Sequence, residues 1–236
     1  MYIIGDVHGC YKTLCKLIEQ LPNKYDEDIV FVGDLIDRGP DSKSIIELII
    51  KHNYKTVLGN HEQGFLFEID DIIQRILNNT FNPNDTEWYQ NWGGEKTLDS
   101  YGFFYNKTGR KTLLEHIKWM KKLPLYLEYP NIIKNKTLVI SHGYLGAIWK
   151  KRMYIKTVNQ KKRFEEYILW NREVEQVDID IFNIFGHTPV NEPLLTQHYA
   201  NIDTGVYKKD DENLGKLTAL HIPSFDIYQQ ELIDHI

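Results

Sequence analysis

The stretches YIIGDVHG (residues 2–9), IVFVGDLIDRG (residues 29–39) and TVLGNHE (residues 56–62) decide the fold of this chain. In each of them, a short apolar run is followed by glycine and by side chains that can bind a cation. Apolar residues at helical spacing separate the three runs, over residues 14–21 and 45–49. This β-α-β-α-β order predicts parallel strands that are buried on both faces. Such sheets bind ligands beyond the carboxyl ends of their strands, which is where the polar motifs fall.

The rest of the chain predicts further strands and a helical segment. Because no long helical crossover follows His187, four more apolar runs predict a second, more antiparallel sheet; these runs are residues 137–140, 182–185, 199–202 and 216–220. Residues 63–130 carry two helical stripes around a loop-rich aromatic piece, and we interpret them as an insert that covers one rim of the site. Trp88 and Trp92 either line that rim or pack the insert's own core. We expect residues 1–236 to form a single domain that includes this insert.

The composition is ordinary for a soluble protein. Of the 236 residues, 42% are hydrophobic and 26% are charged, and the net charge of −5 argues against broad nucleic-acid binding. No apolar run approaches the length of a membrane span, and Met1 leads into the first strand without a signal-like segment. Cys10 and Cys15 lie in a predicted helix and imply no disulfide framework. We therefore expect a cytoplasmic protein without a nucleic-acid or membrane partner, and the pattern leaves its oligomeric state open.

Six polar side chains near the ends of predicted strands form a candidate metal centre. Residues two apart on an extended strand project from the same face, so Asp6 and His8 can converge on one cation. The carboxylate of Asp34 can bridge two cations through its two oxygens. The ligands then divide into two sets, with Asp6, His8 and Asp34 for one ion and Asp34, Asn60, His142 and His187 for the other. Carboxylate, imidazole and amide oxygen suit Mn, Fe or Zn, and ions about 3.5–4 Å apart can deprotonate a bridging water for in-line attack on phosphorus.

Four further residues are candidates for direct catalytic roles. Asp37 lies where the chain already turns away from the metals, and His61 follows the Asn60 ligand directly, so its side chain points away from that ligand. A hydrogen bond to Asp37 would keep the His61 imidazole protonated and ready to protonate a leaving oxygen. Arg38 and Arg172 could hold phosphate oxygens through their guanidinium groups. The alternatives are a purely structural Asp37–His61 pair and arginines in surface ion pairs.

Three other features leave two interpretations open. Glu62 is expected to support the metal site or to begin a helix rather than to act in catalysis. Asp203 serves a turn or lines the metal rim. Residues 150–163 contain seven basic residues, which either steer a phosphorylated substrate or form a solvated surface.

With these motifs the chain resembles the metal-dependent phosphoprotein phosphatase family, whose signature is GDxHG, GDxxDRG and GNHE followed by two separated histidines. It is most similar to small bacterial and bacteriophage members such as the phage lambda protein phosphatase, which share segments like residues 170–173 and 186–189. The similarity is close over residues 1–60 and holds in outline from residue 137 onward. One departure is SHGY at residues 141–144, where relatives often have His-Ala-Gly.

The resemblance implies an α/β fold, namely a four-layer αββα calcineurin-like metallophosphoesterase sandwich with a parallel start, antiparallel C-terminal strands and a helical insert. It maps the family's metal ligands, general acid, supporting carboxylate and phosphate-binding arginines onto the ten residues named above. Two divalent ions are implied as cofactors, with Mn²⁺ the most expected and Fe or Zn as alternatives.

The activity implied by this resemblance is that of a serine/threonine protein phosphatase, with phosphorylated proteins or peptides as partners and phosphotyrosine as a further candidate substrate. The alternative is a symmetrical dinucleoside tetraphosphate hydrolase, which shares the fold and the metals. Those enzymes often have Ala at the position of Asp37 and GNHD in place of residues 59–62. Asp37 favours the protein phosphatase, because an alkoxide leaving group needs a proton more than a nucleotide phosphate does. A catalytically silent binding module is not favoured, since no motif position is broken.

Overall fold

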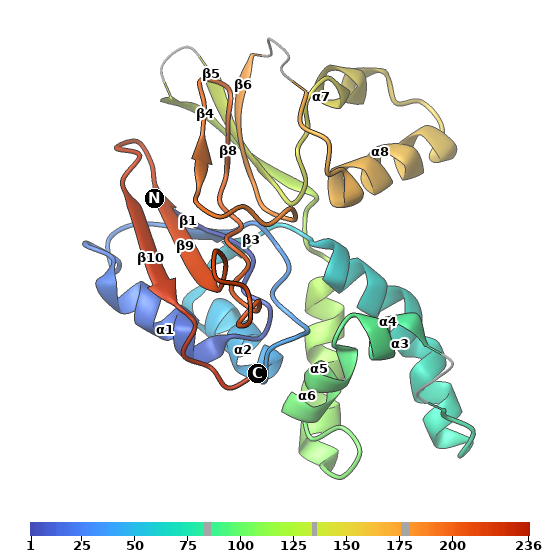
Figure 1. Cartoon of the computed structure of the whole chain (residues 1–236). Helices are drawn as coiled ribbons and strands as arrows, with labels where there is room; N and C mark the ends of the chain where they lie inside the picture. The colour runs from blue at the N-terminus through green and yellow to red at the C-terminus, as the bar shows by residue number, and fades with distance from the viewer. Residues whose placement is uncertain (83–85, 134–135, 176–179) are drawn as a thin grey trace.

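Two sheets pack face to face and carry helices on their outer faces (Figure 1). The computed structural model describes residues 1–82, 86–133, 136–175 and 180–236. The strands are β1 (Tyr2–Ile4), β2 (Ile29–Phe31), β3 (Lys55–Thr56), β4 (Tyr126–Ile133), β5 (Lys136–Ser141), β6 (Ile181–Phe185), β7 (Leu194–Leu195), β8 (Tyr199–Asn201), β9 (Lys216–His221) and β10 (Ile227–Glu231). The helices are α1 (Tyr11–Gln20), α2 (Ser42–His52), α3 (Asn60–Leu77), α4 (Glu87–Asn91), α5 (Gly94–Ser100), α6 (Lys107–Met120), α7 (Ile148–Lys151), the short 3-10 helix η2 (Arg152–Tyr154) and α8 (Val158–Trp170).

The first sheet begins as the sequence predicts. Its strand order is β10-β9-β1-β2-β3, and both β1–β2 and β2–β3 are parallel pairs, with Ile3 opposite Val30. Side chains alternate across β1, so Tyr2 and Ile4 pack with the apolar faces of α1 and α2 while Ile3 packs toward the second sheet. The first three motifs therefore leave their strands at one edge of this sheet.

The second sheet differs in part from its prediction. Its strand order is β4-β5-β6-β8-β7, and β5, β6 and β8 pair in parallel while the outer pairs β4–β5 and β7–β8 are antiparallel. The C-terminal strands β9 and β10 are antiparallel, as expected, but they belong to the first sheet, where Tyr2 of β1 lies opposite His221 of β9. The four predicted runs thus do not form one sheet, because an apolar pattern indicates burial without identifying the neighbouring strand.

Apolar clusters hold the layers together. Between the sheets, Ile3 and Val30 pack with Leu138 and Ile184. On the outer face of the second sheet, residues of α7 and α8 cover Val139 and its neighbours. With α1 and α2 outside the first sheet, these clusters give the predicted four-layer α-β-β-α order.

Helices α3 to α6 make up the helical insert, which extends away from the sheets in Figure 1. α3 and α6 coincide with the two predicted stripes, whereas the piece expected to be loop-rich contains the short helices α4 and α5. Because β4 begins at Tyr126, the insert ends slightly before the predicted boundary at residue 130. Trp88 is fully buried, with its ring centroid 4.9 Å from that of Phe65, while Trp92 is only partly buried.

Two expectations from composition can be compared with the structure directly. Cys10 occupies the position just before α1 rather than lying within a helix, and Cys15 lies inside it; both are free thiols. Within the described ranges, no helix combines the length and apolar character needed to cross a membrane.

Candidate active site

All six predicted ligands are buried and lie just beyond the carboxyl ends of strands from both sheets. They are Asp6 and His8 after β1, Asp34 after β2, Asn60 at the start of α3, His142 after β5, and His187 after β6. The backbone is left-handed at His8, Asp34 and His187, where φ is 46°, 48° and 67°. Residues other than glycine adopt this conformation rarely, and strain of this kind is concentrated at functional sites.

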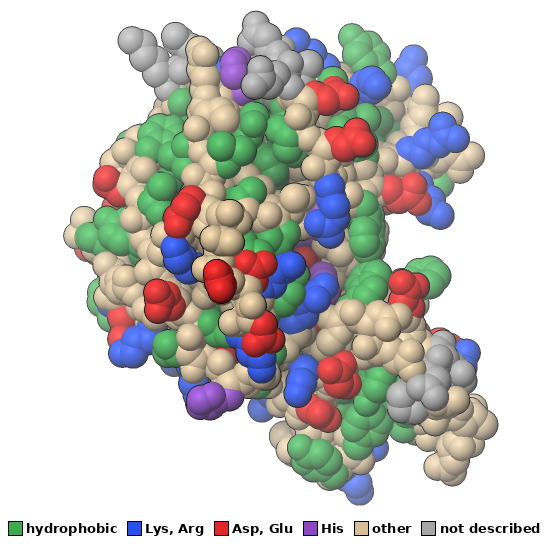
Figure 2. All heavy atoms as spheres, viewed as in Figure 1, with side chains coloured by type: hydrophobic (Ala, Val, Ile, Leu, Met, Phe, Trp, Pro, Cys, Tyr) green, Lys and Arg blue, Asp and Glu red, His purple; other side chains and the backbone are tan. Residues whose placement is uncertain are grey.

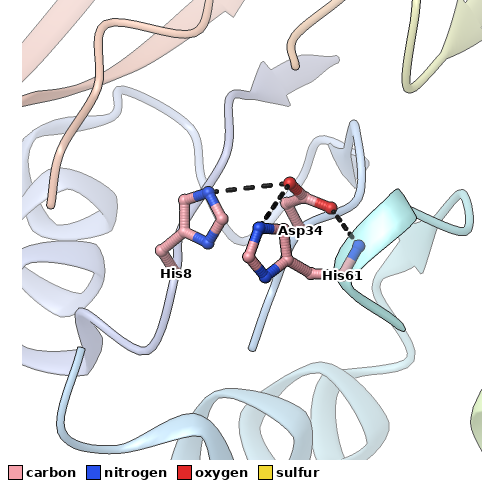
Figure 3. A group of neighbouring side chains, drawn as sticks. All are labelled: His8, Asp34 and His61. Carbon is pink, nitrogen blue, oxygen red and sulfur yellow. Dashed lines mark hydrogen bonds and ion pairs between the residues drawn. The ribbon is translucent and has the colours of Figure 1, made fainter. Parts of the chain in front are cut away.

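The carboxylate of Asp34 faces His8 and His61 in Figure 3. Its Oδ2 is 3.6 Å from Nε2 of His8, and its Oδ1 is 3.4 Å from Nε2 of His142. Oδ1 also accepts a hydrogen bond of 3.0 Å from the backbone N–H of His61. Because its two oxygens face different imidazoles, Asp34 is placed to bridge two cations.

The side chains of His142 and His187 direct ring nitrogens at one amide oxygen. Oδ1 of Asn60 is 2.7 Å from Nε2 of His142 and 2.9 Å from Nδ1 of His187. Nδ1 of His142 lies 3.0 Å from the carbonyl oxygen of Val32, which can only accept, so this nitrogen carries the ring proton. Nε2 therefore points a lone pair at an oxygen that also offers only lone pairs. A cation held by both atoms resolves this conflict, and the donor set fits a metal.

The neutral form of imidazole, which binds metals, is favoured at these histidines. Nδ1 of His8 lies 3.1 Å from the carbonyl oxygen of Ile36, so Nε2 of His8 also presents a lone pair to Asp34. Burial lowers the pKa of His8 and of His142. Burial, followed by the neighbouring His142, lowers the pKa of His187 to about 3.

Two groups of side chains in the described part of the chain have ligand atoms within 4.8 Å of one another; they are His8, Asp34 and His61, and Asp34, His142 and His187. Asp6 belongs to neither group. Since β1 ends at Ile4, Asp6 and His8 are held by the turn after the strand and not, as predicted, by an extended strand. Oδ1 of Asp6 is buried and has no hydrogen-bond partner among the residues that the structure describes. Burial and the charges of Asp203 and Asp34 raise the pKa of Asp6 well above its usual value. A nearby cation favours the ionised carboxylate and would lower this raised pKa.

Glu62 and Asp203 both support the site. The buried carboxylate of Glu62 accepts hydrogen bonds from the backbone N–H groups of Asp34 at 3.0 Å and Leu35 at 2.8 Å, which ties the start of α3 to the loop after β2. Oδ1 of Asp203 accepts a hydrogen bond of 2.9 Å from the N–H of Gly205, as expected for a turn. Burial, with the charge of Asp34, raises the pKa of Asp203 to about 7, so this residue also lines the acidic site.

Asp37 and His61 form the predicted pair, and two residues of the insert complete it. Nδ1 of His61 lies 2.7 Å from Oδ2 of Asp37. Nε1 of Trp88 donates to the same oxygen at 2.7 Å, and Oγ1 of Thr97 donates to Oδ1 at 2.6 Å. Burial acts to lower the pKa of His61, but the charge of Asp34 and the hydrogen bond to Asp37 raise it overall. The imidazole is thus held in a form that can donate a proton.

The two predicted arginines stand beside histidines of the site. Nη2 of Arg38 is 3.4 Å from Nε2 of His61, and the guanidinium lies 4.3 Å from the ring centroid of Tyr207. Tyr207, to which no motif pointed, also packs edge-on against His8 with centroids 4.7 Å apart. Arg172 is exposed and donates from Nη1 to the carbonyl oxygen of His187 at 2.8 Å. Both guanidinium groups therefore lie beside the candidate metal site.

Comparison with known proteins agrees with this geometry. Residues 1–214 match the model of the calcineurin-like phosphoesterases. The asymmetrical bis(5'-nucleosyl)-tetraphosphatase PrpE of Anoxybacillus flavithermus is 30% identical to the chain, over 95% of this chain and 91% of that protein. The corresponding protein of Oceanobacillus iheyensis is 28% identical, over 94% of this chain and 88% of that protein. A serine/threonine phosphatase structure from Saccharomyces cerevisiae has a TM-score of 0.56 at 15% identity, and the match covers all of this chain (100%) and 80% of that one.

These comparisons confirm the predicted sandwich and refine the predicted resemblance. The yeast structure supports the fold alone, while the two relatives matched over nearly their whole length are named tetraphosphatases rather than protein phosphatases of the phage lambda type. The match to the family model covers β1 to β8 and every predicted metal ligand. The chain belongs to the calcineurin-like phosphoesterase family.

Proposed function

We propose that the protein is a metal-dependent hydrolase that cleaves dinucleoside tetraphosphates asymmetrically, giving a nucleoside triphosphate and a nucleoside monophosphate. The observation that carries this proposal is the similarity, over 94–95% of the chain, to relatives named asymmetrical tetraphosphatases. The substrate is the same as in the alternative function considered from the sequence, the symmetrical hydrolase. The proposed scissile bond, however, lies toward one end of the phosphate chain and not in its middle.

The side chains of the site have separate tasks in this reaction. Bound divalent cations would lower the pKa of a water molecule and polarise the phosphoryl group that it attacks. Arg38 and Arg172 would bind phosphate oxygens as charge-assisted donors. As the water oxygen bonds to phosphorus and the bond to the leaving phosphate oxygen breaks, His61 would donate a proton to that leaving oxygen. Asp37 holds the His61 ring in the orientation this transfer needs.

We propose Mn²⁺ as the working metal, with Fe and Zn as alternatives. The donor set supports this choice, because it combines imidazole, carboxylate and amide oxygen without a thiolate. Asp6, His8 and Asp34 would hold one ion, and Asp34, Asn60, His142 and His187 the other.

A second candidate is the hydrolysis of phosphoserine and phosphothreonine in proteins, which the sequence favoured. The observation in its favour is the Asp37–His61 pair, since an alkoxide gains most from a proton donor. The tetraphosphatase ranks first because a proton donor also assists the departure of a phosphate, whereas the names of the relatives point to dinucleoside substrates.

Turnover of diadenosine tetraphosphate and of a phosphoserine peptide, measured side by side, tests the proposal. The protein is first stripped of metal by a chelator, then supplied with Mn²⁺, Fe²⁺ or Zn²⁺ in turn, and the products are separated by ion-exchange chromatography. We expect ATP and AMP in equal amounts, with the highest rate in Mn²⁺. ADP as the sole product would mean symmetrical cleavage, and turnover of the peptide alone would establish the protein phosphatase instead.

A further inference from the structure

A cleft of about 710 Å³ opens beside the active site, between α3 of the insert and α8. In Figure 2 it corresponds to the hollow between the surface over α8 and the surface over α3 and α4. Small-molecule sites have volumes of about 300–1,000 Å³, so the cleft is large enough for a nucleoside. The residues that matter most on its walls are Gln63, Phe67, Trp92, Val158, Lys161 and Trp170.

Two tryptophans join this cleft to the catalytic residues. The ring centroid of Trp92 is 5.4 Å from that of His61, and the centroid of Trp170 is 6.2 Å from that of His187. The two indoles are 5.3 Å apart, and Nε1 of Trp170 donates a hydrogen bond of 2.9 Å to Oε1 of Gln63. A group bound in the cleft would therefore lie only one aromatic ring away from the reacting phosphate.

The backbone of α3 is shaped to accept one of these rings. A Cβ atom at Gly64 would collide with the six-membered ring of Trp92, so only glycine lets the indole lie against the helix at this point. The position of Trp92 at the cleft therefore depends on Gly64 of α3.

The walls of the cleft expose apolar surface that the fold does not use. Phe67 is 86% exposed and Val158 is 83% exposed, on α3 and α8 respectively, and Trp170 is 39% exposed. Exposed apolar side chains gathered around a concave surface mark a binding site more often than chance. Phosphate binding does not need them, because phosphate is recognised by charged donors.

Polar groups stand next to this apolar surface. Lys161 pairs with Glu165 at 3.7 Å, and Lys162 pairs with Glu166 at 3.9 Å; all four residues line the cleft. Part of the basic run at 150–163 therefore faces the cleft in ion pairs, and the carboxylates of Glu68 and Glu87 also line it. A flat ligand whose edge carries both hydrogen-bond donors and acceptors matches such a wall, and a nucleobase has this chemistry.

We propose that the cleft binds one nucleobase of a nucleoside polyphosphate, stacked on Trp170 and Phe67, while the phosphate chain passes Trp92 to reach the metal site. This inference rests on the proposed tetraphosphatase function and adds to it the place where the substrate's base is recognised. Base stacking on aromatic side chains tolerates different bases, so the cleft would accept adenine and guanine alike.

The test compares AMP with ribose 5-phosphate, which lacks only the base, as inhibitors of p-nitrophenyl phosphate hydrolysis in Mn²⁺. For the wild type we expect AMP to bind at least 10-fold more tightly than ribose 5-phosphate. Phe67→Ala and Trp170→Ala should each reduce that ratio to twofold or less. Tyr154→Ala is the matched control, because Tyr154 is 73% exposed and does not line the cleft; its ratio should equal that of the wild type.

Two measurements separate failure of this inference from failure of the proposed function. If the wild type converts diadenosine tetraphosphate to ATP and AMP but the inhibitor ratio is close to one, the cleft is not the base site and the function stands. If the ratio is 10 or more but no tetraphosphate is cleaved, the base site stands and the function is wrong. Phe67 is 86% exposed, so its truncation should leave the fold intact. If the inhibitor ratio of Phe67→Ala equals that of the wild type, the assignment is also overturned.

Discussion

The indole N–H of Trp88 donates a hydrogen bond of 2.7 Å to Oδ2 of Asp37, the same oxygen that lies 2.7 Å from Nδ1 of His61. Trp88 belongs to α4 of the insert, whereas Asp37 lies in the loop after β2. Trp88 packs in the core of the insert, as one of its two interpretations expects, and its indole N–H also reaches Asp37. The insert therefore contacts Asp37, the partner of His61, and does more than cover a rim.

Thr97 provides the cleanest way to test this role of the insert. Its hydroxyl donates to Oδ1 of Asp37 at 2.6 Å and accepts from the backbone N–H of Asp37 at 2.9 Å. Thr97→Val removes these two hydrogen bonds and a third, of 3.0 Å, with the Ser42 hydroxyl, with almost no change of shape. We expect it to lower the free energy of unfolding by about 1.5–3 kcal/mol. We also expect kcat for alkyl phosphates to fall about 10-fold, equivalent to about 1.4 kcal/mol in the barrier.

The control for this experiment is Thr97→Ser, which keeps the hydroxyl and loses only a methyl group. Urea denaturation and kcat should both stay close to the wild type for this variant. If Thr97→Val slows p-nitrophenyl phosphate as much as alkyl phosphates, the hydroxyl contributes to the fold alone and not to the proton donor.

His61→Asn tests the proton donor itself. p-Nitrophenolate leaves without protonation, whereas an alkoxide does not, so we expect turnover of alkyl phosphates to fall about 10²–10⁴-fold and that of p-nitrophenyl phosphate far less. Steady-state kcat for the two substrates gives the comparison. Equal losses on both would remove His61 from the general-acid role.

The elements predicted well are those whose signal is local. The sequence predicts β1, α1, β2 and α2 because a few consecutive residues are enough to show a continuous apolar run or a helical stripe. Either pattern indicates an element with a buried face. β4 was missed because it is an edge strand with half-exposed side chains and contains Pro130, so its pattern is weak. The partner of β9 could not be predicted, because antiparallel pairing with β1 joins residues about as far apart as the chain allows.

The site shows the same division between local and distant information. The six predicted ligands and the Asp37–His61 pair lie in motifs, each a few residues long, that can be recognised without the fold. Trp88 and Thr97 lie 51 and 60 residues from Asp37 and belong to no motif, so only the packing of the insert reveals their hydrogen bonds to Asp37. Tyr207 was missed for the same reason, since its contacts with Arg38 and His8 depend on the turn after β8.

Asp34→Asn tests the bridging assignment. An amide offers one neutral oxygen in place of two charged ones, so we expect metal content to fall below two ions per chain and activity to fall at least about 10³-fold. Elemental analysis after dialysis against Mn²⁺ measures the metal content, and substrate turnover measures the activity. Asp71→Asn, an exposed aspartate on α3 that pairs with Arg75, should leave both unchanged. Normal turnover at normal metal content in Asp34→Asn would contradict the bridging role.

The pH dependence of stability can be examined at His116, which lies on α6 away from the metal site. Its Nδ1 is 2.6 Å from Oη of Tyr101, and burial lowers the pKa of His116. The folded protein therefore binds fewer protons than the unfolded chain below the usual histidine pKa of about 6.5. The free energy of unfolding must then fall as the pH drops from about 6.5 toward the lowered pKa of the folded state.

His116→Gln removes this titration while keeping an acceptor for the Tyr101 hydroxyl. We expect the variant to lose less stability than the wild type between about pH 7 and pH 5, since its side chain binds no proton in either state. Urea denaturation of the metal-free protein at half-unit pH steps measures the slope. The buried ligand residues contribute equally to the wild type and the variant, so the difference between the two slopes isolates His116. His52→Gln, at the exposed end of α2, should keep the wild-type slope. Equal slopes for His116→Gln and the wild type would mean that burial of His116 does not make folding sensitive to acid.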